Sequence, residues 1–249
     1  MRTAVVLLHA FPLDARMWKH QVDLLGNDYE LIAPDLRGFG RNAAQASGLD
    51  VISIEQAADD VANLLDREGI EKAVVGGISR GGYIAMAFAR RHPRKLAGLM
   101  LFDTRATPAD DNERRFWLGV AERLCAEGIA FLPDALRDRL FGPTALHSRR
   151  SLVAEVESWI LSQNPNAVAA AAMGMPGRAD FRASLSQIQA PALALAGTED
   201  SAFASTKEIA EVIPGAEFVE IPAAGHLTPL EDPGRVSQAI RRFLDRTLF

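Results

Sequence analysis

Short runs of apolar residues alternate along the chain with longer stretches in which apolar residues recur every three or four positions. Runs that are apolar throughout are typical of strands buried on both faces, as in a parallel sheet. The recurring spacing is typical of amphipathic helices, and the alternation of the two predicts an α/β fold with right-handed crossovers. The six predicted strands are residues 5–8, 30–33, 73–75, 96–102, 192–196 and 217–221.

Amphipathic stretches between these strands predict helices that pack against the sheet. Residues 15–25 have an apolar side that includes Val22 and Leu24. Ser53, with a glutamine three residues later, forms the pattern of a capping box and predicts a helix that begins there and runs to about residue 67. The other two predicted helices of this kind are residues 83–91 and 234–248.

Residues 104–186 break this rhythm, because they show no convincing strand pattern. Glycine and proline residues divide them into four helix-like stretches. We therefore expect an α/β core of residues 1–103 and 187–249, interrupted by a helical unit of residues 104–186. The four predicted helices of this unit are residues 108–127, 129–141, 148–163 and 167–173.

The composition excludes several classes of protein. Of 249 residues, 48% are apolar, and a formal charge of -5 gives no reason to bind a nucleic-acid backbone. The single cysteine, Cys125, excludes an intramolecular disulfide and a cysteine-based zinc site. No apolar run approaches the roughly 20 residues that span a bilayer, and we interpret residues 4–8 as a buried strand and not as a signal peptide. We therefore expect a cytoplasmic protein with no nucleic-acid partner and no membrane partner.

The strongest chemical signal is the turn Gly77-Ile78-Ser79-Arg80-Gly81, which lies between a predicted strand and a predicted helix. This is the context of a G-x-S-x-G nucleophile elbow, in which glycines two residues before and after the serine remove side chains that would clash. Ser79 would then project at a helix N-terminus, where the helix dipole favours negative charge. The turn lacks the glycine spacing of a dinucleotide fingerprint and the Gly-Lys pair of a phosphate loop, so a glycine-rich turn without a chemical role is the remaining alternative.

A nucleophilic serine needs a base to accept its proton, and the base needs a carboxylate that fixes its tautomer. Among five histidines, His226 and His9 directly follow predicted strands, whose carboxyl ends share one edge of the sheet. We favour His226, because the tight turn after His9 leaves that ring little freedom. For the acid we favour Asp200, which follows the fifth strand, with Glu199 and Asp103 as alternatives.

Four motifs, in order along nearly the whole chain, resemble those of the α/β-hydrolase family. They are the turn around Ser79, an oxyanion turn at residues 9–12, a D-x-R-G-x-G loop at residues 35–40 and a G-H-x-x-x-x-E-x-P ending at residues 225–233. The resemblance implies that the backbone N–H groups of Phe11 and Arg80 form an oxyanion hole and that residues 104–186 form a cap over the site. It also implies an all-parallel sheet with the strand order 2-1-3-4-5-6.

Within the family, the chain resembles small bacterial esterases and 3-oxoadipate enol-lactonase-like members, on the stretches at residues 101–106 and 177–180. The resemblance implies hydrolysis of a small carboxylic ester through a triad of Ser79, His226 and Asp200, by way of an acyl-enzyme and without a metal or cofactor. The alternatives are an enol-lactonase, a C–C bond hydrolase, a cofactor-free haloperoxidase-like enzyme, or a ligand receptor that keeps the triad without turnover.

Five side chains carry expectations about the substrate pocket, which would take a small ester or lactone. We expect Ala10, Asp103, Trp117 and Trp159 to line it. Arg80 stands where the resembled enzymes usually carry methionine. We interpret its side chain either as the partner of a carboxylate on a neighbouring strand end or as a pocket group that binds an acidic substrate.

The implied strand order leaves residues 30–33 at an edge of the sheet. An uncovered edge strand offers unpaired backbone groups to another chain. We therefore expect a homodimer through this strand, with the alternative that residues 40–50 fold over it.

Overall fold

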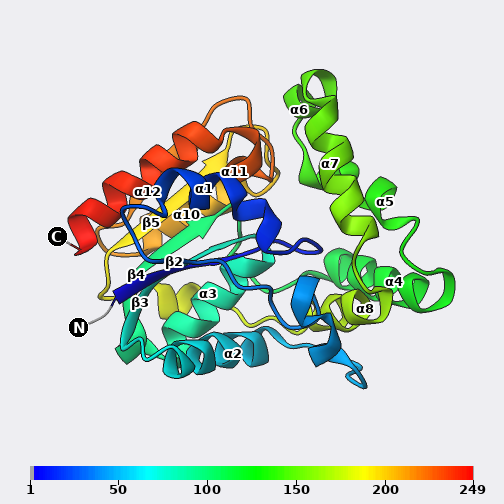
Figure 1. The fold of residues 1–249 in the computed structure, drawn as a ribbon, viewed down its shortest axis with the longest axis horizontal. Coiled ribbons are helices and arrows are strands. Elements are labelled where there is room, and N and C mark those ends of the chain that lie inside the picture. The colour runs from blue at the N-terminus through cyan, green and yellow to red at the C-terminus, as the bar shows by residue number, and fades with distance from the viewer. Residues whose placement is uncertain (1–2, 249) are drawn as a thin grey trace.

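The computed structural model describes residues 3–248 and centres on a six-stranded sheet in which all neighbouring strands are parallel (Figure 1). The strand order is β2-β1-β3-β4-β5-β6, which confirms the predicted order and fold class. The first two residues and the last residue of the predicted core lie outside the described residues. The strands are β1 (Thr3–Leu8), β2 (Leu31–Ile32), β3 (Lys72–Ile78), β4 (Leu96–Phe102), β5 (Ala192–Gly197) and β6 (Glu217–Ile221).

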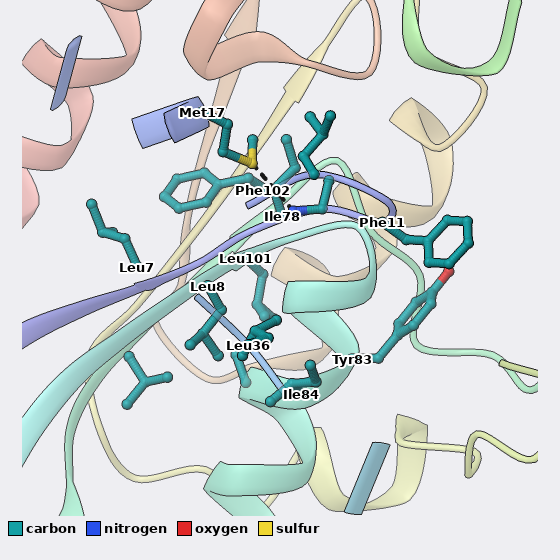
Figure 2. Close-up of a cluster of buried hydrophobic side chains, with 14 of the residues drawn as sticks. Leu7, Leu8, Phe11, Met17, Leu36, Ile78, Tyr83, Ile84, Leu101 and Phe102 are labelled. Carbon is teal, nitrogen blue, oxygen red and sulfur yellow. Dashed lines mark hydrogen bonds between the residues drawn. The ribbon is translucent and has the colours of Figure 1, made fainter. Parts of the chain in front are cut away.

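Helices cover both faces of the sheet, which explains why its central strands are apolar throughout. They are α1 (Lys19–Leu25), α2 (Ile54–Arg67), α3 (Arg80–Arg91), α10 (Phe203–Val212), α11 (Thr228–Glu231) and α12 (Pro233–Leu248), with 3-10 helices η1 (Ala15–Trp18), η2 (Gly40–Ala46) and η3 (Pro93–Lys95). Figure 1 shows α1 and α12 on one face and α2 and α3 on the other. Side chains such as Leu8, Ile78, Leu101 and Ile84 form one buried cluster, with Phe11 and Tyr83 at its margin (Figure 2).

The capping signal is confirmed, but two other helix predictions need correction. Ser53 Oγ accepts the Gln56 N–H at 3.0 Å, and α2 begins directly after Ser53. The predicted single helix 15–25 is η1 followed by α1, because the Asp14 carboxylate caps a 3-10 turn first. Val22 and Leu24, predicted on its apolar side, are 41% and 51% exposed. Helix α10 was not predicted, since few of its residues are buried and its apolar spacing is weak.

Residues 104–186 form six helices where four were predicted, and none of these described residues lies in a strand. The predicted helix 148–163 is interrupted at Arg149, whose φ of -120° and ψ of 46° are not helical. The helices are α4 (Asp111–Glu127), α5 (Leu132–Leu140), α6 (Pro143–Ser148), α7 (Arg150–Leu161), α8 (Pro165–Gly174) and α9 (Arg182–Leu185). Figure 1 shows α4 to α8 gathered on the side toward which the strands run. Among residues 3–248, no helix is long and apolar enough to cross a membrane.

The predicted edge strand is present, although it is shorter than predicted. Only Leu31 and Ile32 pair with β1, opposite Val5 and Val6. A strand of two residues presents few free backbone groups to a second chain. Association through this edge stays a prediction.

Candidate active site

Ser79 occupies a sharp turn between β3 and α3. Its φ of 55° and ψ of -118° place a non-glycine residue in the left-handed region, which costs roughly 1–3 kcal/mol. The flanking glycines permit the turn, because a Cβ on Gly77 would lie 2.1 Å from the Gly81 carbonyl oxygen and one on Gly81 would lie 2.3 Å from the Leu8 carbonyl oxygen. The turn therefore has the backbone geometry that the glycine spacing predicts.

His226 and Asp200 meet across the loops that follow β6 and β5. His226 Nδ1 lies 3.0 Å from Asp200 Oδ2, so the ring donates its Nδ1–H to the carboxylate. Burial raises the pKa of Asp200, but the charge and hydrogen bond of His226 outweigh it and hold the pKa below its ordinary value. With Nδ1 protonated, Nε2 is the atom that can accept a proton.

Ser79 and His226 line one cavity of about 70 Å³ at the carboxyl edge of the sheet. The cavity also receives side chains from α4 and α5, so the core and the helical segment enclose it together. Within residues 3–248, no group of three His, Cys, Asp or Glu side chains could hold a metal ion. The other lining residues are Phe11, Tyr83, Asp103, Thr104, Arg105, Glu113, Trp117, Leu136, Arg139, Leu140, Met175, Ser201 and Ala202.

The wall of this cavity contains two arginines, Arg105 and Arg139, and two acidic residues, Asp103 and Glu113. Glu113 is neutralised by Arg178, which donates to both of its carboxylate oxygens at 2.7 Å. Arg105 donates to the backbone oxygen and the hydroxyl of Ser201, and Arg139 lies 3.9 Å from the centre of the Phe116 ring. Neither Arg105 nor Arg139 forms an ion pair with another residue in the described range 3–248.

Asp103, an alternative for the acid, also lines the cavity but is engaged elsewhere. Its fully buried carboxylate accepts the Gly197 N–H at 2.9 Å and the Thr228 hydroxyl. Burial, and next the charge of Asp200, raise the pKa of Asp103 well above its ordinary value. Glu199, the other alternative, accepts the backbone N–H and hydroxyl of Thr144. The structure thus brings Asp200, and neither alternative, to His226.

Arg80 fits neither of the two interpretations made from the sequence. Its side chain is fully buried, and none of its three guanidinium nitrogens has a hydrogen-bond partner among the described residues. The guanidinium carbon lies 5.5 Å from the centre of the Phe39 ring, and Arg80 is not among the residues that line the cavity. Burial lowers the pKa of Arg80 to about 10. Both interpretations failed because the side chain packs against an aromatic ring and reaches neither the strand-end carboxylates nor the cavity.

The residues predicted to line the pocket divide into two groups. Asp103 and Trp117 line the cavity, and Trp117 contacts the ring of Phe11 edge to face there, with ring centres 5.1 Å apart. Ala10 is fully buried, does not line the cavity and donates its N–H to the Met17 sulfur. Trp159 lies on α7 against two cations, Arg16 and Lys19, and does not line this cavity.

Several lining residues were missed by the sequence analysis. Tyr83 lies four residues after Ser79 on α3, so helical spacing alone could have placed it one turn below the serine. Glu113, Leu136 and Arg139 come from α4 and α5, whose orientation over the sheet has no signal in the local pattern.

Comparisons with known proteins agree with this architecture. A family model described as alpha/beta hydrolase fold matches residues 3–233. A thermophilic esterase from Thermogutta terrifontis, solved with malate bound, has a TM-score of 0.94 and 39% identity, covering 100% of this chain and 92% of that chain. The enol-lactonase from Burkholderia xenovorans LB400 has a TM-score of 0.88 and 27% identity, covering 98% and 92%. The 3-oxoadipate enol-lactonase 2 of Acinetobacter baylyi is 24% identical over 98% of this chain and 90% of its own length.

Proposed function

The chain belongs to the alpha/beta hydrolase fold family, and we propose that it is a serine hydrolase that cleaves carboxylic esters through Ser79, His226 and Asp200. One observation carries the proposal. Ser79, on a strained turn, shares a cavity with His226, whose Nδ1 is held 3.0 Å from Asp200. A nucleophile, a base and a carboxylate that orients the base are the parts that acyl transfer needs.

The reaction follows from the protonation states of these groups. Ser79 Oγ attacks the ester carbonyl carbon while His226 Nε2 takes the hydroxyl proton. Asp200 accepts the Nδ1–H, stabilises the imidazolium and stays ionised, in keeping with its low pKa. The imidazolium then protonates the leaving alcohol, and an acyl-enzyme remains on Ser79. The same ring activates a water molecule that releases the acid and restores the serine.

The tetrahedral oxyanion needs hydrogen-bond donors, and we assign this role to the backbone N–H groups of Phe11 and Arg80. Arg80 is the first residue of α3, so its N–H has no acceptor within the helix. Phe11 lines the cavity from the loop after β1. Each such donor typically lowers the barrier by about 3–4 kcal/mol.

The small volume of the cavity, about 70 Å³, favours a short acyl group. A carboxylate on that group would suit Arg105 and Arg139, which present guanidinium groups without a carboxylate partner among the described residues. An enol-lactone or the monoester of a dicarboxylic acid would fit this charge. The malate in the Thermogutta terrifontis esterase and the names of the enol-lactonases agree with such a substrate.

The decisive experiment compares hydrolysis of 4-nitrophenyl acetate and the 4-nitrophenyl monoester of succinic acid. Ser79→Ala and His226→Ala should each lower turnover by several orders of magnitude, and the double variant should be no slower than either, because the two residues act as one unit. Ser186→Ala, on an exposed serine between α9 and β5, is the control. Ligand binding without turnover of any ester or lactone would favour a receptor instead.

The same pair of substrates tests the proposed charge preference. Arg139→Gln should reduce kcat/KM for the succinate monoester about 10-fold and leave the acetate ester nearly unchanged. Arg115→Gln is the matched control, since this exposed arginine on α4 donates a hydrogen bond to Asn112 and does not line the cavity. An equal effect of Arg139→Gln on both esters would contradict the preference without contradicting ester hydrolysis. Cleavage of a C–C bond, or haloperoxidase activity, in place of ester hydrolysis would identify the protein as one of those two alternative enzymes.

A further inference from the structure

The two backbone N–H groups that flank His226 are both bound by one buried carboxylate. Glu231, the last residue of α11, accepts the Gly225 N–H at Oε2 at 3.0 Å and the Leu227 N–H at Oε1 at 3.2 Å. Gly225 and Leu227 are the two neighbours of His226 in the chain. One side chain therefore fixes the backbone on both sides of the proposed base.

The neighbouring parts of this loop are fixed by other contacts. Before it, the Ala224 carbonyl accepts the Glu199 N–H at 2.9 Å. After it, the Thr228 hydroxyl donates to Asp103. Between these two points, within residues 3–248, the N–H groups of Gly225 and Leu227 find their acceptors only on Glu231. The Glu231 carboxylate therefore supplies the acceptors for these two backbone N–H groups that a strand or helix would otherwise supply.

The cost of burying Glu231 argues that this contact has a role. Only 4% of the residue is exposed, and its carboxylate forms no ion pair with a described residue. Arg149 approaches it but donates to its backbone oxygen. Burial raises the pKa of Glu231, while the two N–H donors oppose that rise. A buried carboxylate without an ion pair is costly, and charge-assisted hydrogen bonds to both its oxygens are what offset that cost.

We propose that Glu231 is a positioning residue for His226, which sets the ring so that Nδ1 meets Asp200 and Nε2 opens on the cavity that Ser79 lines. The inference rests on the proposed function, since it deepens the role of the same base. Glu231 does not touch the substrate, and it acts only through the backbone. A displacement of a catalytic group by about 1 Å can cost on the order of 100-fold in rate.

The test is Glu231→Gln, which preserves shape but turns one acceptor into an NH₂ donor that faces an N–H group. We expect kcat for the acetate ester to fall roughly 10- to 100-fold with KM unchanged. We also expect the far-downfield proton resonance of His226 Nδ1–H, assigned by its loss in His226→Ala, to shift or broaden. Glu217→Gln is the matched control, because it removes the same charge from an ion pair with Arg246 at the opposite end of β6.

Two outcomes would overturn the proposal. A folded Glu231→Gln protein with wild-type kcat and an unmoved Nδ1–H resonance overturns the proposal, as does a rise in KM alone. If the glutamine variant does not fold, Glu231→Asp, which keeps the charge on a shorter side chain, should show the same kcat loss and resonance shift to a smaller degree. The resonance requires no turnover, so a wild-type protein that is inactive on esters would refute the proposed function while the positioning of His226 remained measurable.

Discussion

Replacement of Arg80 by methionine should stabilise the protein. The guanidinium is fully buried, and all three of its nitrogens lack hydrogen-bond partners among the described residues. A buried charge without a partner costs free energy that an apolar side chain of similar length does not. Methionine can fill the space of the arginine stem beside Phe39 without bringing a charge into it.

The expected gain can be worked from the environment of Arg80. The burial that lowers its pKa to about 10 disfavours the charged side chain by about 3 kcal/mol. The contact with the Phe39 ring returns about 1 kcal/mol of that cost. We therefore expect the free energy of unfolding to rise by about 1–3 kcal/mol, within the range found when buried charges are replaced by apolar residues.

The assay is urea and thermal unfolding at pH 7.5, with Arg178→Met as the comparison. The Arg178 side chain is also fully buried, but it donates to both oxygens of Glu113 and stacks on the Tyr83 ring at 4.6 Å. Loss of this pair leaves the half-buried Glu113 carboxylate without its partner and should destabilise the protein, by at most about 3–5 kcal/mol. For Arg80→Met we expect Tm to rise by about 2–4 °C per kcal/mol.

Two results would refute this reasoning. One is an Arg80→Met protein that loses as much stability as Arg178→Met, which would mean that Arg80 has a partner in solution. The other is a selective loss of activity on the succinate monoester, which would return Arg80 to the substrate pocket. Ester hydrolysis itself should survive, because the Arg80 backbone N–H does not depend on the side chain.

Three further expectations follow from the same structure. Asp200→Asn should reduce ester turnover by about 10⁴-fold through the wrong histidine tautomer, whereas Asp103→Asn should remain active because the Asp103 carboxylate contacts Gly197 and Thr228 and not His226; the reverse result would move the acid to Asp103. Burial lowers the pKa of His9 to about 4, so between that value and about 6.5 the unfolded chain binds a proton that the native chain does not. Between pH 7.5 and pH 4.5, the free energy of unfolding of the wild-type protein should therefore fall by about 2–3 kcal/mol more than that of His9→Gln. An equal fall for the two proteins in urea unfolding would contradict this. Light scattering should detect a dimer through β2, and a monomer at high micromolar concentration would exclude it.

The parts of the structure that the sequence predicts are those set by short-range constraints. The turn at Ser79 follows from Gly77 and Gly81, whose missing side chains leave room for backbone atoms just over 2 Å from where a Cβ would lie. The strand order was predicted correctly by resemblance, because the four motifs appear in the order of a known topology. The cap of α2 at Ser53 needs only one local hydrogen bond.

The helical segment shows where local patterns stop being informative. Apolar spacing places Trp117 and Trp159 on helices, but it does not tell which helix face meets the cavity. Trp117 faces Phe11 at the cavity, while Trp159 faces the cations of η1 and α1. That difference is decided by how α4 and α7 pack over the core, which depends on contacts between residues far apart in sequence.

The two candidate acids, Asp103 and Asp200, are distinguished by the contacts of their carboxylates, which the local sequence pattern does not give. Asp103 and Asp200 both follow strands at the carboxyl edge, and the sequence favours Asp200 while leaving Asp103 as an alternative. The charge of Asp200 adds to burial in raising the pKa of Asp103, because a second negative charge disfavours ionisation. The Thr228 hydroxyl and the Gly197 N–H hold the Asp103 carboxylate, whereas the charge and hydrogen bond of His226 lower the pKa of Asp200. Asp200 is therefore the carboxylate whose surroundings favour the ionised form that a histidine base requires.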